Sequence, residues 1–253
     1  MFKKISLALT ALPRIFHARF RCSPHKPCIG LAVSDDWPDR FEFRRLPYDL
    51  ALARAGACVV TFRPQNFPEL DKMLDSVNGL VLAGGEDVHP IFYGGDRHAA
   101  REVNRERDEL ELALLAKAGE RGLPVLCICR GAQLLAVWAG GGLESHDNDL
   151  RAMKIHFSTF FSLARHRVSI KQGTRLYDIL GNEPIRVNSF HHQAIVDPGA
   201  LTVSAVTVKG LIEGVELPGD RFVVGVQWHP ELQAFYKPRQ QALFSALINA
   251  SRR

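Results

Sequence analysis

Short apolar runs alternate with longer helix-forming stretches through the first 140 residues of the chain. Four runs have the length and apolar content of buried strands: Ile29–Val33, Cys58–Phe62, Gly79–Leu82 and Val125–Ile128. The stretches that separate or follow them favour helices, at Tyr48–Ala55, Pro68–Asp75, Arg107–Arg121 and Ala132–Ala139. This rhythm is typical of a mostly parallel sheet flanked by helices. The sequence therefore predicts an α/β fold with its functional groups at the carboxyl ends of the strands.

The pattern changes after about Gly142. Shorter strand candidates follow, separated by turns that contain glycine: Arg167–Ile170, Val203–Val208, Leu211–Val215 and Phe222–Gln227. We interpret them as a smaller mixed or antiparallel extension of the same sheet, closed by a helix from Gln233 to about Ala250. With 253 residues and 46% hydrophobic content, the chain can bury one substantial core. We expect a single catalytic domain over residues 27–253.

Three residues at the ends of two apolar runs have the chemistry of a cysteine-dependent catalytic centre. Cys129 ends one run, and His229 and Glu231 follow another about a hundred residues later. A thiol needs a neighbouring imidazole to hold it as a thiolate and to protonate the leaving group. A carboxylate fixes the tautomer of that imidazole. We predict Cys129 as nucleophile, His229 as base and Glu231 as its orienting partner.

The turn after Cys129 supports this assignment. Arg130-Gly131 leads directly into a helix-forming stretch, so the helix N-terminus would lie beside the sulfur and the Arg130 N–H could face an oxyanion. The paired glycines Gly84-Gly85 allow a second close backbone approach, and we predict the Gly85 N–H as the other donor. Cys127 precedes Cys129 by two residues and is expected to face the same side, but it does not adjoin the turn.

These segments resemble those of a known family. Cys-Ile-Cys-Arg-Gly-Ala-Gln looks like the nucleophile elbow of class I glutamine amidotransferases, and Gly-Val-Gln-Trp-His-Pro-Glu looks like their His-x-Glu element. Three further segments are similar to the γ-glutamyl-γ-aminobutyrate hydrolase branch, which cleaves γ-glutamyl amides in putrescine breakdown: 78–94, Arg107-Asp108 and 187–194. The resemblance runs from about Cys28 to the C-terminus. It implies a class I glutamine amidotransferase-like fold.

The resemblance also implies a reaction and a substrate site. Cys129 would attack the γ-amide carbonyl, and water would hydrolyse the resulting γ-glutamyl thioester, releasing glutamate and an amine without any cofactor. Gln133 is placed to hydrogen-bond the glutamyl group, and the loop with Asn188, Ser189 and His191 is expected to line the site of its α-amino and carboxylate groups. If the amine is γ-aminobutyrate, the partner of its carboxylate stays open among three candidates: Arg107, Arg130 and the His89 loop.

Two other functions compete with this hydrolase. The chain could be the glutaminase subunit of a two-protein amidotransferase, or an inert binding module. A metal site is not expected, because the adjacent histidines His191 and His192 rarely point at one ion and no other ligands accompany them at suitable spacing. The sequence leaves a homodimer open.

Charge and cysteine content exclude further classes. The chain has 32 Lys and Arg against 27 Asp and Glu, but six basic residues and no acidic ones precede Asp35. The remaining 26 basic and 27 acidic residues nearly balance, which disfavours nucleic acid as a partner. We interpret residues 1–26 as a basic leader that is disordered or targeting. No run is long enough to span a membrane. Five cysteines without disulfide or zinc spacing indicate a reducing compartment, so we expect a cytoplasmic protein.

Overall fold

The computed structural model describes residues 25–34, 44–96, 98, 100–145, 164–191 and 193–252. The predicted leader therefore lies outside the described residues, apart from its last two. Four parallel strands form one half of the sheet, at the positions that the apolar runs predict: β1 (Cys28–Ala32), β2 (Cys58–Phe62), β3 (Gly79–Leu82) and β4 (Val125–Ile128). All of their residues but three in β2 are buried, as expected for strands covered on both faces.

Strand β11 (Val223–Val226) joins this parallel half to the rest of the sheet. Along the main path the order is β2-β1-β3-β4-β11-β10-β9-β6-β7. β11 runs parallel to β4, with Val223 beside Val125, and antiparallel to β10 on its other side. The apolar run at 222–227 thus belongs to the centre of the sheet, and its assignment to the extension alone was wrong. The carboxyl ends of β4 and β11 lie next to each other as a result.

The remaining strands form the predicted antiparallel extension: β5 (Gly142–Ser145), β6 (Ala164–Ile170), β7 (Ile185–Ser189), β8 (Gln193–Asp197), β9 (Thr202–Thr207) and β10 (Ile212–Glu216). The sequence did not indicate β5 or β8. These two short strands pair with each other, and β8 also touches β10. β7 and β8 include Asn188, Ser189 and Gln193, which were expected in a polar loop.

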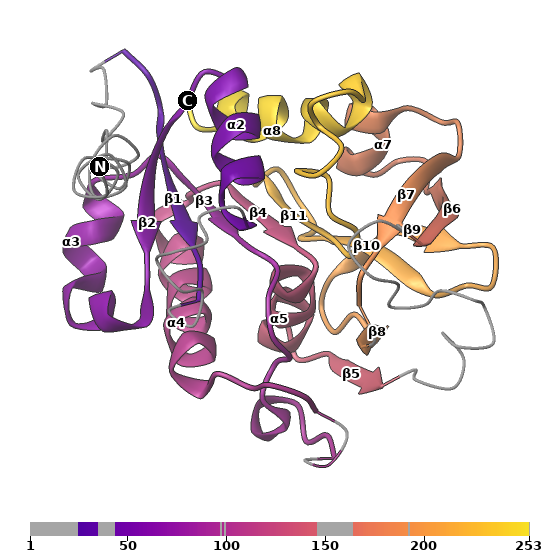
Figure 1. The fold of residues 1–253 in the computed structure, drawn as a ribbon, viewed down its shortest axis with the longest axis horizontal. Helices are drawn as coiled ribbons and strands as arrows, with labels where there is room; N and C mark the ends of the chain where they lie inside the picture. The colour runs from indigo at the N-terminus through magenta and orange to yellow at the C-terminus, as the bar shows by residue number, and fades with distance from the viewer. Residues whose placement is uncertain are drawn as a thin grey trace, which may run out of the picture.

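Helices cover both faces of the sheet (Figure 1). One face carries α2 (Leu46–Arg54), α7 (Arg175–Leu180) and α8 (Pro238–Ala250), and the other carries α3 (Leu70–Asp75), α4 (Arg105–Arg121) and α5 (Arg130–Trp138). Two short 3-10 helices, η2 (Pro64–Glu69) and η3 (Pro90–Phe92), connect strands to helices. Two buried apolar clusters fill the space between the helices and the sheet, one on each face.

The predicted ends of the helices differ from the structure where proline intervenes. The C-terminal helix was expected from Gln233 but begins at Pro238. Proline lacks the N–H that a helix interior needs and keeps the residue before it out of the helical region, so Lys237 is extended and Pro238 occupies the first turn. Among the described residues, no helix has the length and apolar character that a membrane span would require.

Helix α5 lies unusually close to strand β3, and Gly131 makes this possible. A Cβ at Gly131 would be 2.4 Å from the carbonyl oxygen of Leu82, a contact that only backbone movement could relieve. We predict that Gly131→Ala lowers the free energy of unfolding by about 1–3 kcal/mol because the helix must shift. Urea unfolding measures the change.

The matched control is Gly119→Ala, a helix glycine of α4 whose added Cβ would meet side-chain atoms no nearer than 3.7 Å. Alanine favours helix, so this variant should be as stable as the parent or up to about 1 kcal/mol more stable. Equal stability of the two variants would contradict the packing argument.

Candidate functional site

Cys129 lies at a strained turn between β4 and α5. Its backbone has φ 53° and ψ −106°, a conformation that L residues rarely adopt. Its N–H donates to the carbonyl of Val226 at 2.8 Å, which ties the turn to the end of β11. Its own carbonyl accepts the N–H groups of Ala132 and Gln133, so α5 starts directly behind it. The helix N-terminus therefore lies beside the Cys129 residue.

The same strain separates Cys129 from Cys127. Cys127 packs in the apolar cluster beneath α4 and α5, whereas Cys129 belongs to the cluster on the opposite face of the sheet. The expectation that both sulfurs face the same side was wrong, because the positive φ turns the chain out of the strand before Cys129. Burial and the charge of Glu111 raise the pKa of Cys127 well above its usual value. Cys127 is therefore a buried neutral thiol.

His229 and Glu231 lie just beyond the end of β11. His229 Nδ1 is 2.6 Å from Glu231 Oε1, so the two side chains face the same way across Pro230, as the sequence predicted. A carboxylate only accepts, so Nδ1 carries the hydrogen and Nε2 stays available in the neutral ring. Asn188 holds the backbone of His229 with two hydrogen bonds of 2.9 Å. The Phe190 ring packs edge-on against the imidazole, with centroids 5.6 Å apart.

Cys129 and His229 meet across Gly84. A Cβ on Gly84 would be 2.6 Å from His229 Cε1 and 3.5 Å from Cys129 Cβ, so only glycine fits between them. Burial lowers the pKa of His229, but the charges of Glu231 and Cys129 and hydrogen bonds to both outweigh burial and raise it well above the usual value. The structure thus brings all three predicted catalytic residues together in a buried setting that favours an imidazolium.

The turn at Gly84-Gly85 is fixed from two sides. Arg107 Nη2 donates to the carbonyls of Ala83 and Gly84, each at 3.1 Å, and the Gly84 N–H donates to the Tyr48 hydroxyl at 3.1 Å. In a trans peptide the N–H points opposite to the carbonyl. The Gly85 N–H, which shares its peptide with the Gly84 carbonyl, therefore points away from the Arg107 guanidinium.

Arg107 also explains why residue 85 is glycine. A Cβ at Gly85 would be 2.1 Å from Arg107 Nη1. That guanidinium cannot move aside easily, because it is fully buried and donates to Glu111 at 2.7 Å and to Glu86 at 2.8 Å. The glycine that the sequence singled out for a close backbone approach is thus required by a buried arginine.

Arg130 belongs to the same buried network. Its guanidinium pairs with Asp108 and Glu111, and Glu111 bridges it to Arg107. Burial lowers the pKa of Arg130, but these carboxylates outweigh burial and raise it. Burial raises the pKa of Asp108 despite its arginine neighbours. Both guanidinium groups already pair with protein carboxylates, which disfavours Arg107 and Arg130 among the three candidate partners of a substrate carboxylate.

The four residues predicted to bind the substrate have different hydrogen-bond partners in the structure. Gln133 is buried and donates to the Gln193 carbonyl at 2.9 Å and to Gln227 at 3.3 Å. The side-chain amide of Asn188 makes its two hydrogen bonds to the backbone of His229. Ser189 Oγ is buried, without a hydrogen-bond partner among the described residues. His191 Nδ1 lies 2.9 Å from the Gln193 carbonyl. All four lie near the centre, but Gln133 and Asn188 hold other protein groups.

Sequence reasoning missed two neighbours of the centre, Gln227 and Tyr48, and placed Gln193 only in the polar loop. Gln227 Nε2 lies 3.7 Å from Cys129 Sγ, and Gln193 Nε2 donates to the Tyr93 hydroxyl at 3.3 Å. Tyr48 supports Gly84 from α2. Burial and the nearby charge of Glu231 raise the Tyr48 pKa well above its usual value. Gln227 directly precedes Trp228 and His229, so its place in that motif was a usable signal. Nothing local to Tyr48 marks its long-range contact with Gly84.

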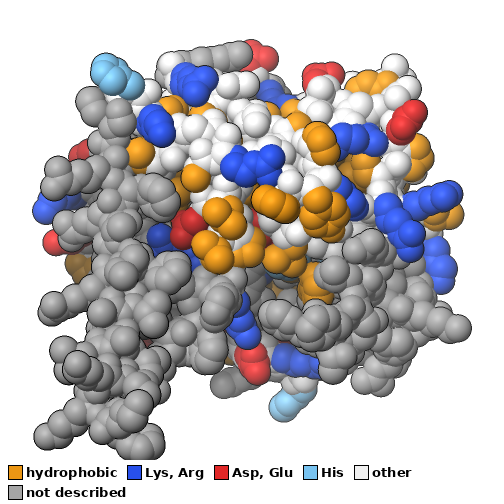
Figure 2. Space-filling model, turned by 45° about the horizontal axis from the view of Figure 1, so that its top comes forward, with side chains coloured by type: hydrophobic (Ala, Val, Ile, Leu, Met, Phe, Trp, Pro, Cys, Tyr) orange, Lys and Arg blue, Asp and Glu red, His pale blue; other side chains and the backbone are white. Residues whose placement is uncertain are grey.

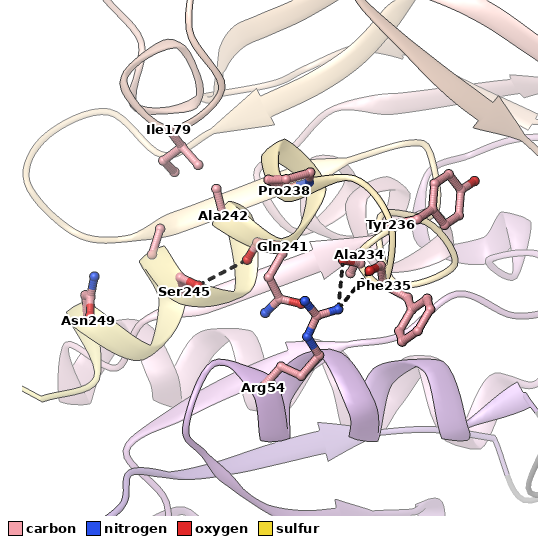
Figure 3. Close-up of a pocket in the computed structure, with 11 residues that line it drawn as sticks. Arg54, Ile179, Ala234, Phe235, Tyr236, Pro238, Gln241, Ala242, Ser245 and Asn249 are labelled. Atoms are coloured by element: carbon pink, nitrogen blue, oxygen red, sulfur yellow. Dashed lines mark hydrogen bonds between the residues drawn. The ribbon is translucent and has the colours of Figure 1, made fainter.

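A groove elsewhere on the molecule is not part of this centre. It has a volume of about 520 Å³ and lies between α8, the segment 234–236 and Arg54, which donates to the carbonyls of Ala234 and Phe235 (Figure 3). No predicted site residue lines it. Figure 2 brings the side of α2 and α8 toward the viewer and shows hydrophobic side chains gathered there. Leu50, Phe235 and Tyr236 are among the exposed large hydrophobic residues.

Within the described ranges, no group of three or more histidine, cysteine or acidic residues is arranged to hold a metal ion.

Comparison with known proteins identifies the family. The family model described as Peptidase C26 matches residues 35–231, which is most of the chain. The chain belongs to the Peptidase C26 family. This finding confirms the resemblance to class I glutamine amidotransferase-like proteins that the motifs at Cys129 and His229 carry.

Named relatives of this Peptidase C26 member are consistent with the family assignment. It is 43% identical over 236 residues to a Mycobacterium tuberculosis protein (strain ATCC 25618 / H37Rv) named provisionally as a glutamine amidotransferase, covering 89% of this chain and 75% of that one. It is 32% identical over 199 residues to the γ-glutamyl-γ-aminobutyrate hydrolase PuuD of Escherichia coli (strain K12), covering 72% and 74%. The family and these relatives support a hydrolase or amidotransferase-like function.

Solved structures confirm the fold. The CTPS glutaminase domain of Trypanosoma brucei with bound acivicin superposes with a TM-score of 0.65 at 15% identity, over 90% of this chain and 94% of that one. A glutamine amidotransferase of Thermotoga maritima gives a TM-score of 0.57 at 14% identity, over 90% and 97%. At these identities the likeness concerns the fold, which is the predicted class I glutamine amidotransferase fold of this Peptidase C26 member.

Cys127 and Cys129 have different surroundings, so their thiols should differ in reactivity. At neutral pH, iodoacetamide should label Cys129 much faster than Cys127, because burial keeps Cys127 as an unreactive thiol. Peptide mass spectrometry of the native protein measures both sites. Cys127→Ala should leave labelling at residue 129 unchanged. Faster labelling of Cys127 than of Cys129 in the folded protein would show that we chose the wrong sulfur.

Proposed function

We propose that this Peptidase C26 member is a cysteine-dependent hydrolase of γ-glutamyl amides, acting on γ-glutamyl-γ-aminobutyrate or a related γ-glutamyl amine. The observation that carries the proposal is the convergence of Cys129 and the His229–Glu231 pair on Gly84. The 32% identity to a γ-glutamyl-γ-aminobutyrate hydrolase over 72% of the chain supports the substrate class.

The reaction begins with an ion pair. The imidazolium of His229 favours the thiolate of Cys129, and the N-terminus of α5 adds partial positive charge beside it. The thiolate attacks the γ-amide carbonyl carbon, forming a carbon–sulfur bond and a tetrahedral oxyanion. The N–H groups of Gly85 and Arg130 donate to this oxyanion. Their backbone is held in place by the guanidinium of Arg107 and by the start of α5.

Collapse of the tetrahedral intermediate breaks the carbon–nitrogen bond. His229 gives its proton to the departing amine, which leaves a γ-glutamyl thioester on Cys129. His229 then takes a proton from water, and the resulting hydroxide attacks the thioester. A second collapse releases glutamate and restores the thiolate–imidazolium pair. Glu231 keeps the imidazole in the tautomer that presents Nε2 to the sulfur.

A second function has one observation in its favour. The 43% relative is named provisionally as a glutamine amidotransferase, so the chain could instead supply ammonia to a synthetase partner. A subunit of that kind depends on its partner for activity and prefers glutamine. A hydrolase works alone and accepts larger amines.

One assay separates these functions. Purified protein is incubated with γ-glutamyl-γ-aminobutyrate, glutamine and a γ-glutamyl polyamine, and released glutamate is measured. We expect turnover of at least one γ-glutamyl amine without any partner, and a loss on the order of a thousandfold or more in Cys129→Ala. The matched control, Cys127→Ala, should keep its activity. Turnover of glutamine alone would favour the glutaminase, and no turnover of any substrate would favour an inert module.

The pH dependence tests the role of Glu231. Its charge raises the pKa of His229, and the proposed reaction needs the imidazolium as proton donor, so activity falls as pH rises through that pKa. Glu231→Gln removes the charge and lowers the pKa. We therefore predict a lower but measurable rate and an alkaline limb of the kcat/KM profile that moves toward neutral pH.

The control for this experiment is Glu120→Gln, which changes an exposed carboxylate in the last turn of α4 that is not among the groups acting on the His229 pKa. Its alkaline limb should coincide with that of the parent protein. An alkaline limb that stays in place in Glu231→Gln would refute the assignment of Glu231 as the group that raises the His229 pKa.

A further inference from the structure

A row of buried amide groups leads from strand β8 to the sulfur of Cys129. Gln133, on α5, donates from Nε2 to the carbonyl of Gln193 at the start of β8, at 2.9 Å. The same Nε2 lies 3.3 Å from Oε1 of Gln227, which directly follows β11. Gln227 Nε2 in turn lies 3.7 Å from Cys129 Sγ. The row therefore ends on the atom that forms the thioester in the proposed reaction.

The backbone carbonyl at the start of the row fixes the polarity of every group after it. A carbonyl oxygen only accepts, so Gln133 must turn its NH2 group toward Gln193. Because that NH2 group also faces Gln227, Gln227 must present its oxygen there; two facing NH2 groups would make no hydrogen bond. The NH2 group of Gln227 is then directed at the sulfur. Cys129 thus receives an N–H donor from this side.

Gln227 is held at both ends. Its backbone N–H donates to the carbonyl of Glu213 on β10 at 2.8 Å, and its side-chain oxygen accepts from Gln133. Its side chain is fully buried, so water does not compete for the amide. A donor that is fixed before the reaction needs no reordering when charge develops beside it. The NH2 group is therefore in place whether the sulfur is neutral or charged.

A donor at this position favours the charged form of the sulfur. Cys129 is buried, with only 5% of its surface exposed, and a buried anion is costly unless hydrogen bonds replace those of water. A thiol sulfur is a weak acceptor, whereas hydrogen bonds to a charged acceptor are markedly stronger. The same N–H group therefore stabilises a thiolate more than a thiol.

We infer that Gln227 is a further catalytic residue of the proposed hydrolase, whose side-chain N–H holds the Cys129 sulfur as a thiolate, and that Gln133 acts through it as a positioning residue. His229 supplies a charge that depends on pH, whereas the Gln227 amide is a donor that does not titrate. The inference rests on the proposed function only for the role of Cys129 as nucleophile, since the amide row itself needs no substrate.

The pH dependence of thiol labelling tests the donor without any substrate. Iodoacetamide labelling of Cys129 in the full-length protein is followed by peptide mass spectrometry, and the labelling midpoint is the pH at which the rate constant reaches half of its plateau. Among the described residues, His229 and Tyr48 respond to the charge of Cys129 in their pKa values, and Glu231 acts on both. All three stay unchanged in the variants that follow, so a shifted midpoint reports the amide.

The decisive variant is Gln227→Met, which keeps an unbranched side chain of similar length and removes both N–H groups. We expect its labelling midpoint to rise by about half a pH unit or more, because a hydrogen bond to the charged form is lost. The acid limb of its kcat/KM profile should move by the same amount. An unshifted midpoint in folded Gln227→Met would overturn the inference.

The matched control is Gln240→Met. Gln240 is a second buried glutamine, and its Oε1 accepts the indole N–H of Trp228 at 2.9 Å, one residue away from His229. This variant should lose stability and keep the labelling midpoint of the parent protein. An equal rise in Gln240→Met would assign the effect to packing around Trp228 and overturn the role of the Gln227 amide.

Gln133→Met tests the row behind the donor. Without the NH2 group of Gln133, the amide of Gln227 is no longer fixed in one orientation, so the midpoint should rise by less than in Gln227→Met. The double variant should shift no further than Gln227→Met alone, because both changes act on one hydrogen bond to the sulfur. Additive shifts would overturn the relay from Gln133.

A second substitution keeps the inference testable if Gln227→Met does not fold, which thermal unfolding reveals. Gln227→Glu preserves the shape, but its carboxylate has no donor and repels a thiolate, so the midpoint should rise further than in the methionine variant. A parental midpoint in folded Gln227→Glu would count against the donor.

Labelling and hydrolysis together separate the two proposals. A shifted midpoint in a protein that hydrolyses no γ-glutamyl amide keeps the amide donor and rejects the hydrolase. Hydrolysis by the parent protein with an unshifted midpoint in Gln227→Met does the reverse.

Discussion

The buried pairing of Arg107 and Arg130 with Glu86, Asp108 and Glu111 is the interaction on which the rest of the centre depends. Arg107 fixes the carbonyls of the Gly84-Gly85 turn, and Arg130 begins the helix behind Cys129. Glu111 contacts both guanidinium groups, so the two backbone segments that flank the sulfur share one carboxylate. Breaking such a buried pair typically costs about 3–5 kcal/mol because a charge is left without a partner. The geometry of the turn and the stability of the domain are therefore coupled.

Backbone contacts around the same turn explain how a strained residue persists at position 129. A positive φ at a non-glycine residue is unfavourable by itself. It is held by the hydrogen bond to Val226, by the start of α5 and by the close packing of Gly131 on Leu82. Because the strain turns the chain out of β4, Cys129 reaches His229 while Cys127 stays in the opposite apolar cluster. One local distortion thus distinguishes two cysteines that look equivalent along the chain.

The sequence predicted the parallel strands and the convergence of Cys129, His229 and Glu231, because both depend on local patterns. Apolar runs bounded by polar or turn residues mark β2, β3 and β4 at their observed bounds. Position within the sheet depends on pairing between distant segments, so β11 was assigned to the extension alone. The partners of Gln133, Asn188 and Arg107 were missed for the same reason, since each lies between 41 and 60 residues away or within a turn whose shape the sequence does not specify.

The pairing of β4 with β11 has a consequence for how the molecule is made. These neighbours are separated by about a hundred residues, and the parallel register between Val125 and Val223 forms only after a long loop has closed. The thiol emerges from the ribosome well before its imidazole partner. A nascent or partly folded chain therefore carries an isolated cysteine, and chemical competence appears only when the last strand has inserted.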